Sequence, residues 1–593
     1  MEVFMIFGKY INCYYRRYWY YFFIGILALV LVDIVQLFIP EIIGNAISSL
    51  DKGTFVDKDY ITVLLSLVGI GALMFIGRSA WRLCINGVGQ KIEYDLRERM
   101  FIHAEKLSVE YYKKQKTGGL MSLYTNDLDA VKTSFMDGTI FLIDAVVLGG
   151  LAMYKMFKMN WLLTVICIVP LALVALCGGV IGKAESVRFK ERQEAFEGLS
   201  DFVQENITGI SVIKAFVKEG QQMKKFAKLN SKNEIANIKY LRYSIMLNSL
   251  ISFLIFSVFG VIMILGGYYV LTGNVIGGGV DFDGGKLSTY FGYFDTLIWP
   301  MLAISMLIDN ISRSRASYNR IAELLKTEPS VKDNLAELRK DLPVFKGALE
   351  FKNLDFSYED DENQKVLQGI SLKINAGENI GIVGRTGSGK TTFVNSILKI
   401  HNIPKDKIFI DGVDINSWPT KVVRDNIGYV AQDSFLFSDL ISNNIAFSNP
   451  KLSMDEVRKA AKFACVDSNI IEFKDGYNTM VGERGVTLSG GQKQRIAMAR
   501  AIVKNPQILI LDDSVSAVDS ETEKTILNNI KELRKGKTTL IIAHRISAVE
   551  KLDHIIVMDN GKIVGYGTHD ELLKSCEIYA KLVELQKLEK EVN

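Results

Sequence analysis

The chain has 593 residues, which is too long for a single ordinary domain of about 100–200 residues. It carries 70 Lys and Arg against 66 Asp and Glu, a formal net charge of +4, so its composition argues against a nucleic-acid-binding protein and no nucleic-acid partner is expected. The six cysteines are scattered without a CxxC pair, which predicts ordinary thiols and no metal centre built from them. The mean hydropathy of +0.17 indicates a large apolar part.

Six long apolar runs occupy the first half of the chain. They cover residues 19–39, 61–81, 139–157, 161–181, 245–271 and 287–308. Each has about 20 residues or more, enough for a helix to cross the roughly 30 Å hydrocarbon core of a bilayer. One such run could be a buried core helix, and the first could be a secretory signal. However, the first run is longer than the apolar region of a signal, and six runs together predict a transmembrane domain.

The distribution of Lys and Arg predicts the orientation of these spans. The segments after the second and the fourth span are long and rich in Lys and Arg, whereas the opposite loops are short and poor in them. By the positive-inside rule, the two long segments and both termini face the cytoplasm of a plasma membrane, with residues 1–18 as an amphipathic cytoplasmic segment. The long segments are expected to continue the spans as helices that turn at Gly118, Gly119 and Gly209.

The pattern changes after the sixth span. Residues 312–344 read as a charged, largely helical linker, and from residue 345 short β-rich runs alternate with helical segments, which is typical of an α/β domain. Strands are expected at 349–356, 370–374, 379–383, 408–410, 508–511, 539–542 and 555–558. The expected organisation is therefore a transmembrane domain of six helices (19–311), a linker (312–344) and an α/β domain (345–593).

The strongest local pattern is Gly384-Arg-Thr-Gly-Ser-Gly-Lys390-Thr391, which fits the P-loop motif GxxxxGK[ST]. It follows an apolar strand and opens a helix, as phosphate binding requires, because glycine-rich backbone N–H groups and a helix N-terminus then face the phosphates. Lys390 is placed for the β- and γ-phosphates and Thr391 for Mg²⁺. The predicted ATP-binding residues of this loop are Gly384, Arg385, Thr386, Gly387, Ser388, Gly389, Lys390, Thr391 and Thr392.

Two further patterns carry the same chemistry. The apolar strand 508–511 ends in Asp512 and Asp513, and a carboxylate at such a strand end suits Mg²⁺ in the Walker B role, although strand-end carboxylates also cap helices. Between the two motifs lies Leu488-Ser-Gly-Gly-Gln492. Ser489, Gly490 and Gly491 would start a helix whose free N–H groups can bind a phosphate, or would form a simple N-cap.

The order of P-loop, LSGGQ and Walker B resembles that of ABC ATPases, and six spans before them resemble a type IV exporter half-transporter over nearly the whole chain. The resemblance extends to Tyr358 as the aromatic that stacks on adenine, Gln432 as the Q-loop residue, 481–485 as the X-loop, 516–519 as the D-loop and His544 as the switch histidine.

The resemblance implies a role for each of these positions. It implies that ATP is held by Tyr358, the P-loop residues and Ser489, Gly490, Gly491 and Gln492, that Mg²⁺ is held by Thr391, Gln432 and Asp512, and that Asp513, His544 and Gln432 are catalytic. It also implies a dimer in which each P-loop faces the LSGGQ of the other chain, and coupling helices near 111–120 and 210–218.

One residue departs from the family pattern. ABC ATPases usually have Glu directly after the Walker B Asp, where it acts as general base or positions the attacking water, whereas this chain has Asp513. The shorter carboxylate falls about 1–1.5 Å short, and a misplacement of about 1 Å can cost roughly a hundredfold in rate. An intact LSGGQ beside this Asp resembles the degenerate-site subunit of bacterial heterodimeric multidrug exporters. The partner would then be a different half-transporter with a normal Walker B Glu. A homodimer in which Asp513 suffices is the alternative.

Charged residues inside or near the predicted spans bear on what is carried: Asp33, Arg78, Asp144, Asp295 and Asp309. They are explained either by helix-to-helix pairing or by a cavity that prefers cationic amphiphiles. Aromatic and Met residues of the sixth span suit a plastic apolar site. The favoured function is ATP-driven export of hydrophobic, often cationic, drug-like compounds. The alternatives are a lipid or peptide exporter, an ATP-gated channel or regulatory half-transporter, and an importer with the exporter fold.

Overall fold

The computed structural model describes residues 8–273, 275–276, 282–334, 337–339, 341–358, 364–482, 485, 488–514 and 518–592, without the side chains of 171–172, 174–180, 520 and 589–592. The chain divides into two compact units. The first consists of Met1–Glu105 and Thr117–Lys326, and the second of Lys106–Lys116 and Thr327–Asn593. The short segment after the second apolar run therefore belongs to the same unit as the α/β part.

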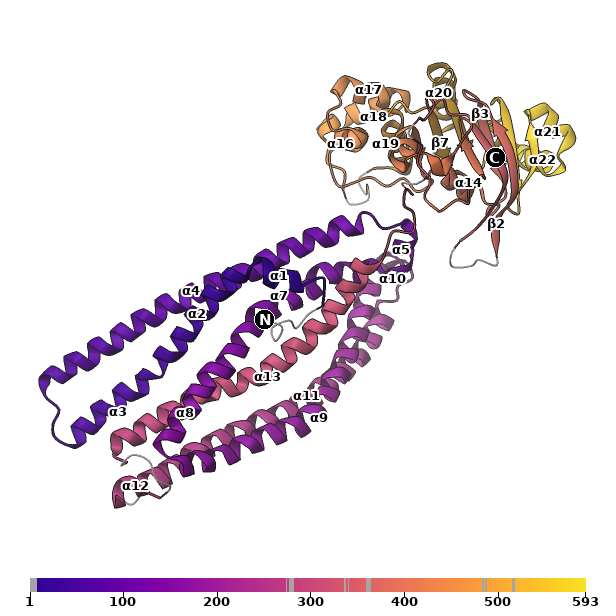
Figure 1. Ribbon diagram of the computed structural model, residues 1–593. Helices are drawn as coiled ribbons and strands as arrows, with labels where there is room; N and C mark the ends of the chain where they lie inside the picture. The colour runs from indigo at the N-terminus through magenta and orange to yellow at the C-terminus, as the bar shows by residue number, and fades with distance from the viewer. Residues whose placement is uncertain are drawn as a thin grey trace. The chain divides into compact units, whose positions relative to one another are not determined.

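The first unit is a bundle of long helices (Figure 1). Its α-helices are α1 (Asn12–Arg17), α2 (Trp19–Gln36), α3 (Phe38–Asp51), α4 (Asp57–Ala104), α6 (Thr117–Ser122), α7 (Leu128–Ile143), α8 (Gly149–Met159), α9 (Trp161–Thr208), α10 (Ile210–Ala215), α11 (Glu219–Val261), α12 (Gly267–Thr272) and α13 (Gly284–Lys326). Three π-helical turns interrupt them: η2 (Leu123–Asp127), η3 (Asp144–Leu148) and η4 (Ile262–Gly266). Helix α4 packs along α2, α11 along α9, and α13 against α3, α7 and α8.

The prediction of a membrane-spanning helical domain is confirmed. Among the described residues, five continuous helical stretches are long and apolar enough to cross a membrane: Trp19–Asp51, Asp57–Ala104, Thr117–Met159, Glu219–Thr272 and Gly284–Lys326. The run predicted at 161–181 forms the start of α9. Its apolar part counts only as Trp161–Pro170 here, because the structure does not describe most side chains between 171 and 180. Large apolar side chains on these helices are exposed, such as Leu83 at 78% and Phe256 at 70%, as expected of surfaces that face lipid.

Two details of the expected first half need correction. Gly118 and Gly119 do not mark the turn, since both lie inside α6, and the chain leaves helical geometry earlier, at Gln115. Gly209 does follow the end of α9 directly and separates it from α10. The linker is also less helical than expected, because α13 ends at Lys326 and the described residues between it and β1 form no helix.

The second unit contains two sheets. A six-stranded sheet has the order β10-β9-β3-β8-β7-β6, in which all pairs are parallel except β10 with β9. A four-stranded antiparallel sheet has the order β2-β1-β4-β5. The strands are β1 (Leu349–Ser357), β2 (Lys365–Ile374), β3 (Asn379–Gly384), β4 (Ile408–Ile410), β5 (Val413–Asp414), β6 (Ile427–Val430), β7 (Ile508–Asp512), β8 (Thr538–Ile542), β9 (His554–Asp559) and β10 (Lys562–Gly567).

Helices cover the six-stranded sheet on both faces. The helices of the second unit are α14 (Lys390–Ile397), α15 (Thr420–Asp425), α16 (Ile441–Ile445), α17 (Met454–Phe463), α18 (Asp467–Glu472), α19 (Gly490–Ile502), α20 (Ser520–Leu533), α21 (His569–Ser575) and α22 (Glu577–Val592), with the short α5 (Val109–Lys114) from the first half of the chain. Of these, α14 packs against β3, α15 against β6, α19 against β6 and β7, and α21 against β10, while α16 and α17 pack on α19. Successive residues of β7 alternate between two cores: Leu509 and Leu511 pack in the core that includes α17 and α19, and Ile508 and Ile510 in the core that includes α14 and β1. Burial on both faces explains why parallel strands such as β7 read as continuous apolar runs.

All seven predicted strands are present within one or a few residues, whereas β5, β6 and β10 were not predicted. The sheet order matters for function because β8 separates β3 from β7, and the three parallel strands end at the same edge. Ligands of open α/β sheets bind beyond the carboxyl ends of such strands.

Candidate functional site

The loop after β3 has a backbone that only glycine adopts easily. Gly387 and Gly389 have φ values of +81° and +94°, in the left-handed region. A Cβ on Gly384 would lie 2.2 Å from the Met558 carbonyl oxygen, and one on Gly389 would lie 3.1 Å from that of Val366. Gly389 directly precedes α14, so the loop delivers the free N–H groups of a helix start to the edge of the sheet.

Lys390, the first residue of α14, is buried and its ammonium group bonds to the loop itself. Its Nζ donates to the carbonyl oxygens of Gly384 and Arg385, each at 2.9 Å. Burial lowers the pKa of Lys390, while the charges of Asp512 and Asp513 act to raise it. A cation held inside a loop of N–H donors is the arrangement that binds a polyphosphate.

Asp512 ends β7 and is 1% exposed. Burial raises the pKa of its carboxyl group, and Asp513 acts in the same direction, whereas the Thr391 hydroxyl, Lys390 and His544 act to lower it. Within the described part of the chain, Asp512 Oδ2 has no hydrogen-bond partner. A buried carboxylate oxygen without a donor, beside a Thr hydroxyl at the start of the P-loop helix, fits the ligand set that Mg²⁺ takes in P-loop ATPases.

These groups line one cavity of about 280 Å³ at the edge of the sheet. It is lined by Val366, Thr386, Gly387, Ser388, Gly389, Lys390, Thr391, Thr392, Gln432, Asp512, Ile542 and His544. Ser388 is nearly buried, and its Oγ also has no hydrogen-bond partner among the described residues, so a phosphate oxygen could satisfy it. Gln432 and His544, predicted from the order of motifs, therefore lie at the same cavity as the P-loop, and Val366 and Ile542 are additions that the sequence did not indicate.

Asp513 follows Asp512 directly but is not among the residues that line the cavity. Its backbone is fixed beside the cavity. It adopts a φ of +46°, which is uncommon for a residue other than glycine, and its N–H donates to the Ile542 carbonyl at 2.9 Å. The position of Asp513 is thus tied to β8, the central strand between the two nucleotide motifs.

Tyr358 lies near the P-loop helix, with its hydroxyl 2.8 Å from Thr392 Oγ1. Its ring centroid is 5.3 Å from that of His401, and Lys113 Nζ of α5 lies 5.3 Å from the ring. The aromatic residue predicted to meet adenine is therefore also in contact with α5, the segment that precedes the third span.

The LSGGQ residues lie apart from this cavity. Ser489 caps α19: its Oγ accepts from the Gln492 N–H at 3.3 Å, and Gln492 Oε1 accepts from the Ser489 N–H at 3.0 Å. Gly490 and Gly491 form the first turn of the helix, where Gly490 is exposed and Gly491 half-buried. The predicted X-loop and D-loop are described only in part, since 483–484 and 515–517 lie outside the described residues. Asp519, the last residue of the predicted D-loop, caps α20 by accepting from the N–H groups of Glu521 and Thr522.

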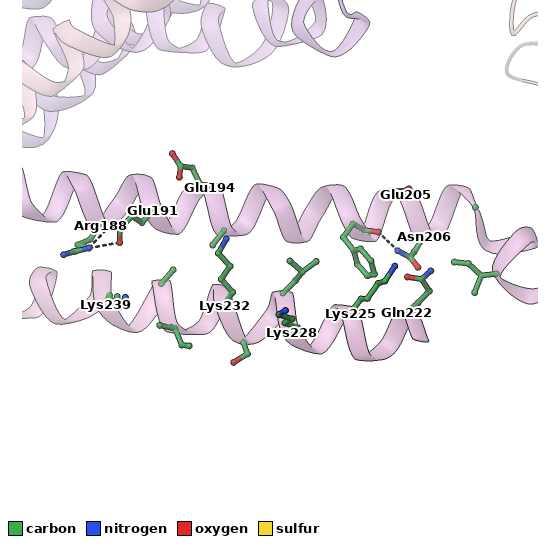
Figure 2. A pocket seen from close by; sticks show the side chains of 18 of the residues that line it. Arg188, Glu191, Glu194, Glu205, Asn206, Gln222, Lys225, Lys228, Lys232 and Lys239 are labelled. Atoms are coloured by element: carbon green, nitrogen blue, oxygen red, sulfur yellow. Dashed lines mark hydrogen bonds and ion pairs between the residues drawn. The ribbon is translucent and has the colours of Figure 1, made fainter. Parts of the chain in front are cut away.

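A larger cavity of about 1450 Å³ lies between α9 and α11 in the first unit. Figure 2 shows charged side chains of both signs along the two helices, with Lys225, Lys228 and Lys232 on α11 and an ion pair of Arg188 with Glu191 on α9. Its lining has no glycine loop and no buried carboxylate, and its glutamates lie on α9 while its lysines lie on α11 (Figure 2). Size alone does not identify the reactive site, and the smaller cavity at the P-loop carries the phosphate chemistry.

Membrane-spanning helices joined to a P-loop ATPase unit define an ATP-driven membrane transporter. The family model of the ABC transporter transmembrane region matches residues 22–301, and that of the ABC transporter matches residues 367–516. The chain belongs to the ABC transporter family, so its second unit binds ATP and couples ATP hydrolysis to transport.

Similar proteins support this assignment over the whole length. The "Probable multidrug resistance ABC transporter ATP-binding/permease protein YheI" of Bacillus subtilis is 35% identical over 98% of this chain and 97% of its own length. The "ATP-dependent lipid A-core flippase" of Syntrophus aciditrophicus is 33% identical over 84% of this chain and 81% of its own. The structure of a bacterial Atm1-family ABC exporter with ATP bound has a TM-score of 0.77 and 26% identity, covering 97% of this chain and 99% of that one.

Proposed function

We propose that this chain is the degenerate-site half of a heterodimeric exporter that uses ATP to move hydrophobic, often cationic, compounds out of the cell. The observation that carries the heterodimer is Asp513, which stands where ABC ATPases have Glu, in a chain whose LSGGQ helix start is complete. The second half is a different chain with the normal Glu. Both termini and the ATPase unit face the cytoplasm, in line with the Lys- and Arg-rich segments.

In this proposal the residues of the cavity hold ATP with Mg²⁺. The N–H groups of residues 384–392 and the Lys390 ammonium bind the phosphates, Tyr358 faces the adenine, and Thr391, Gln432 and Asp512 would hold the ion. Mg²⁺ would neutralise charge on the phosphates during transfer. His544 would act near the γ-phosphate, and the Asp513 carboxylate would fall about 1–1.5 Å short of the attacking water, so hydrolysis at this site would be slow.

The LSGGQ segment completes the other ATP site of the dimer. The Ser489 hydroxyl and the first N–H groups of α19 lie outside the chain's own cavity, and a helix start of this kind binds an anion. The partner's P-loop would supply that anion as ATP phosphate, and the partner's Glu would hydrolyse it. Helices α5 and α10 transmit the resulting closure to the spans as a rigid-body movement.

One observation favours a second candidate. A relative over most of the chain carries the name of an ATP-dependent lipid A-core flippase, so lipid is the alternative cargo. Both cargoes are amphipathic, and the exposed apolar helices of the first unit are compatible with either.

The test of the proposal is hydrolysis by the chain alone and with a partner. The full chain is purified in lipid nanodiscs, alone and co-expressed with candidate half-transporters, and Mg-ATP hydrolysis is measured with and without lipophilic cations. Poor hydrolysis alone and cation-stimulated hydrolysis with a partner support the heterodimer. A fully active homodimer contradicts it, and stimulation by lipid alone supports the lipid exporter instead.

A further inference from the structure

Two buried carboxylates of the first unit come from helices that pack against each other. Asp33 of α2 is 3% exposed, and Asp144, the first residue of η3, is 6% exposed. Helix α2 packs against η3, and both residues lie inside predicted spans. Within the described part of the chain, Asp33 Oδ2 and Asp144 Oδ1 have no hydrogen-bond partner. Polar atoms this deeply buried are normally satisfied, so each oxygen indicates a ligand or a proton.

The cation nearest to this pair does not neutralise it. Gly77 allows α4 to approach α2 closely, since a Cβ there would lie 2.5 Å from Val32 Cγ2, and this brings Arg78 beside the pair. Arg78 acts electrostatically on both carboxylates, yet it is exposed and donates to Gln36 Oε1 at 3.4 Å. No ion pair joins it to either aspartate among the described residues. One guanidinium beside two carboxyl groups can balance only one negative charge, so a second cation is needed when both are ionised.

Helix α13 adds an aromatic surface to the same place. Gly149 allows α8 to approach α13 at Pro300, where a Cβ would lie 3.1 Å from the proline Cβ. Trp299, the residue before this proline, donates from Nε1 to Asp144 Oδ2 at 2.7 Å, which holds the orientation of the indole. Its ring is 43% exposed, and the Phe141 ring lies 6.3 Å away. The π-helical turn that begins at Asp144 is a feature frequent at functional sites.

We propose that Asp33 and Asp144, together with the rings of Trp299 and Phe141, form the receptor for the charged centre of a monovalent organic cation. Carboxylates supply the counter-charge, and the indole face supplies a cation–π contact, which an organic cation uses better than a metal ion does. The described residues contain no group of three or more His, Cys, Asp or Glu side chains that could hold a metal. This inference rests on the proposed export function and specifies its cargo.

The test compares a cation with an uncharged analogue of nearly the same shape. Binding of tetraphenylphosphonium and of triphenylphosphine oxide to the full-length transporter in nanodiscs, with its partner where one is needed, is measured by equilibrium dialysis. Asp33→Asn and Asp144→Asn should each weaken cation binding about tenfold or more and leave the uncharged compound unaffected. Asp129→Asn, which removes an exposed carboxylate of α7, is the matched control and should change neither.

A variant that should bind the cation more tightly separates a specific effect from misfolding, because a misfolded protein would only lose binding. Arg78→Gln should tighten tetraphenylphosphonium binding several-fold, because the competing guanidinium is gone. If Arg78, Asp33 and Asp144 pair only for stability, Arg78→Gln should bind tetraphenylphosphonium as weakly as wild type or more weakly. The two aspartate variants should then lose binding of both compounds equally. Either result overturns the inference. If wild-type protein binds both compounds and the variants do not discriminate, only this inference fails. If it binds neither, the proposed drug export fails as well.

Discussion

The carboxylate of Glu110 in α5 bonds through Oε1 to Nδ1 of His401, although 291 positions separate the two residues. Both side chains are nearly buried, at 12% and 4% exposure. The His401 ring in turn lies beside Phe356 and Tyr358, with centroids 5.2 and 5.3 Å away. A short helix between two membrane spans is thereby connected, through one histidine, to the aromatic residue expected at the adenine.

This contact predicts a variant that uncouples hydrolysis from transport. Glu110→Ala removes the acceptor for His401 and should lower stimulation of ATP hydrolysis by transported compounds about tenfold, while basal hydrolysis stays near wild type, because the cavity at the P-loop is untouched. Hydrolysis is measured with and without a stimulating cation. Glu472→Ala, at an exposed position of the same unit, should leave stimulation intact. Equal stimulation in both variants would show that the Glu110 contact does not carry the coupling.

Asp513 predicts a gain of activity. In the heterodimer, Asp513→Glu restores the missing methylene and should raise turnover at this chain's own site by roughly tenfold to a hundredfold. ATP hydrolysis is measured in a heterodimer whose partner has its Walker B Glu replaced by Gln, so that only hydrolysis at this chain's own site is detected. Asp512→Asn in the same background should abolish the gain. A rate that does not rise with Asp513→Glu would mean that the short side chain does not limit hydrolysis.

Ser489 predicts an effect on the partner's site. Ser489→Ala should reduce hydrolysis by the heterodimer about tenfold while ATP binding at this chain's own P-loop remains, because Ser489 lies outside that cavity. The variant also removes an N-cap, which costs about 0.5–2 kcal/mol of stability. Ser453→Ala is the matched control, since Ser453 forms the same capping box on α17. If both variants reduce hydrolysis equally, the loss is due to the cap and not to phosphate binding.

The P-loop backbone predicts a difference between two glycines. Gly389→Ala combines a left-handed φ of +94° with a Cβ 3.1 Å from the Val366 carbonyl oxygen, so it should lower ATP affinity at least tenfold and destabilise the second unit. Gly412→Ala has a φ of +79° with nothing within 4 Å of the added Cβ. It should cost only the strain of about 1–2 kcal/mol and leave ATP affinity unchanged. ATP titration and thermal unfolding of the full-length protein separate the two effects.

The sequence by itself determined the features whose physical cause is local. The apolar runs are recognisable because a helix must be about 20 residues long to cross a bilayer, and the P-loop because its backbone needs glycine at 387 and 389. Strands such as β3, β7 and β8 stood out because burial on both faces makes them continuously apolar. The replacement of Glu by Asp513 is likewise a matter of sequence alone.

Only the tertiary structure decided which distant residues meet. The strand order brings Thr391, Asp512 and His544 to one cavity, because β8 lies between β3 and β7. β10 escaped prediction because it alternates between exposed and half-buried positions at the edge of the sheet, and β5 because it has only two residues. The contact of Glu110 with His401 and the packing of Asp33 near Asp144 depend on how helices approach one another. Packing between side chains far apart in the sequence determines how the helices approach one another, and local sequence periodicity does not predict it.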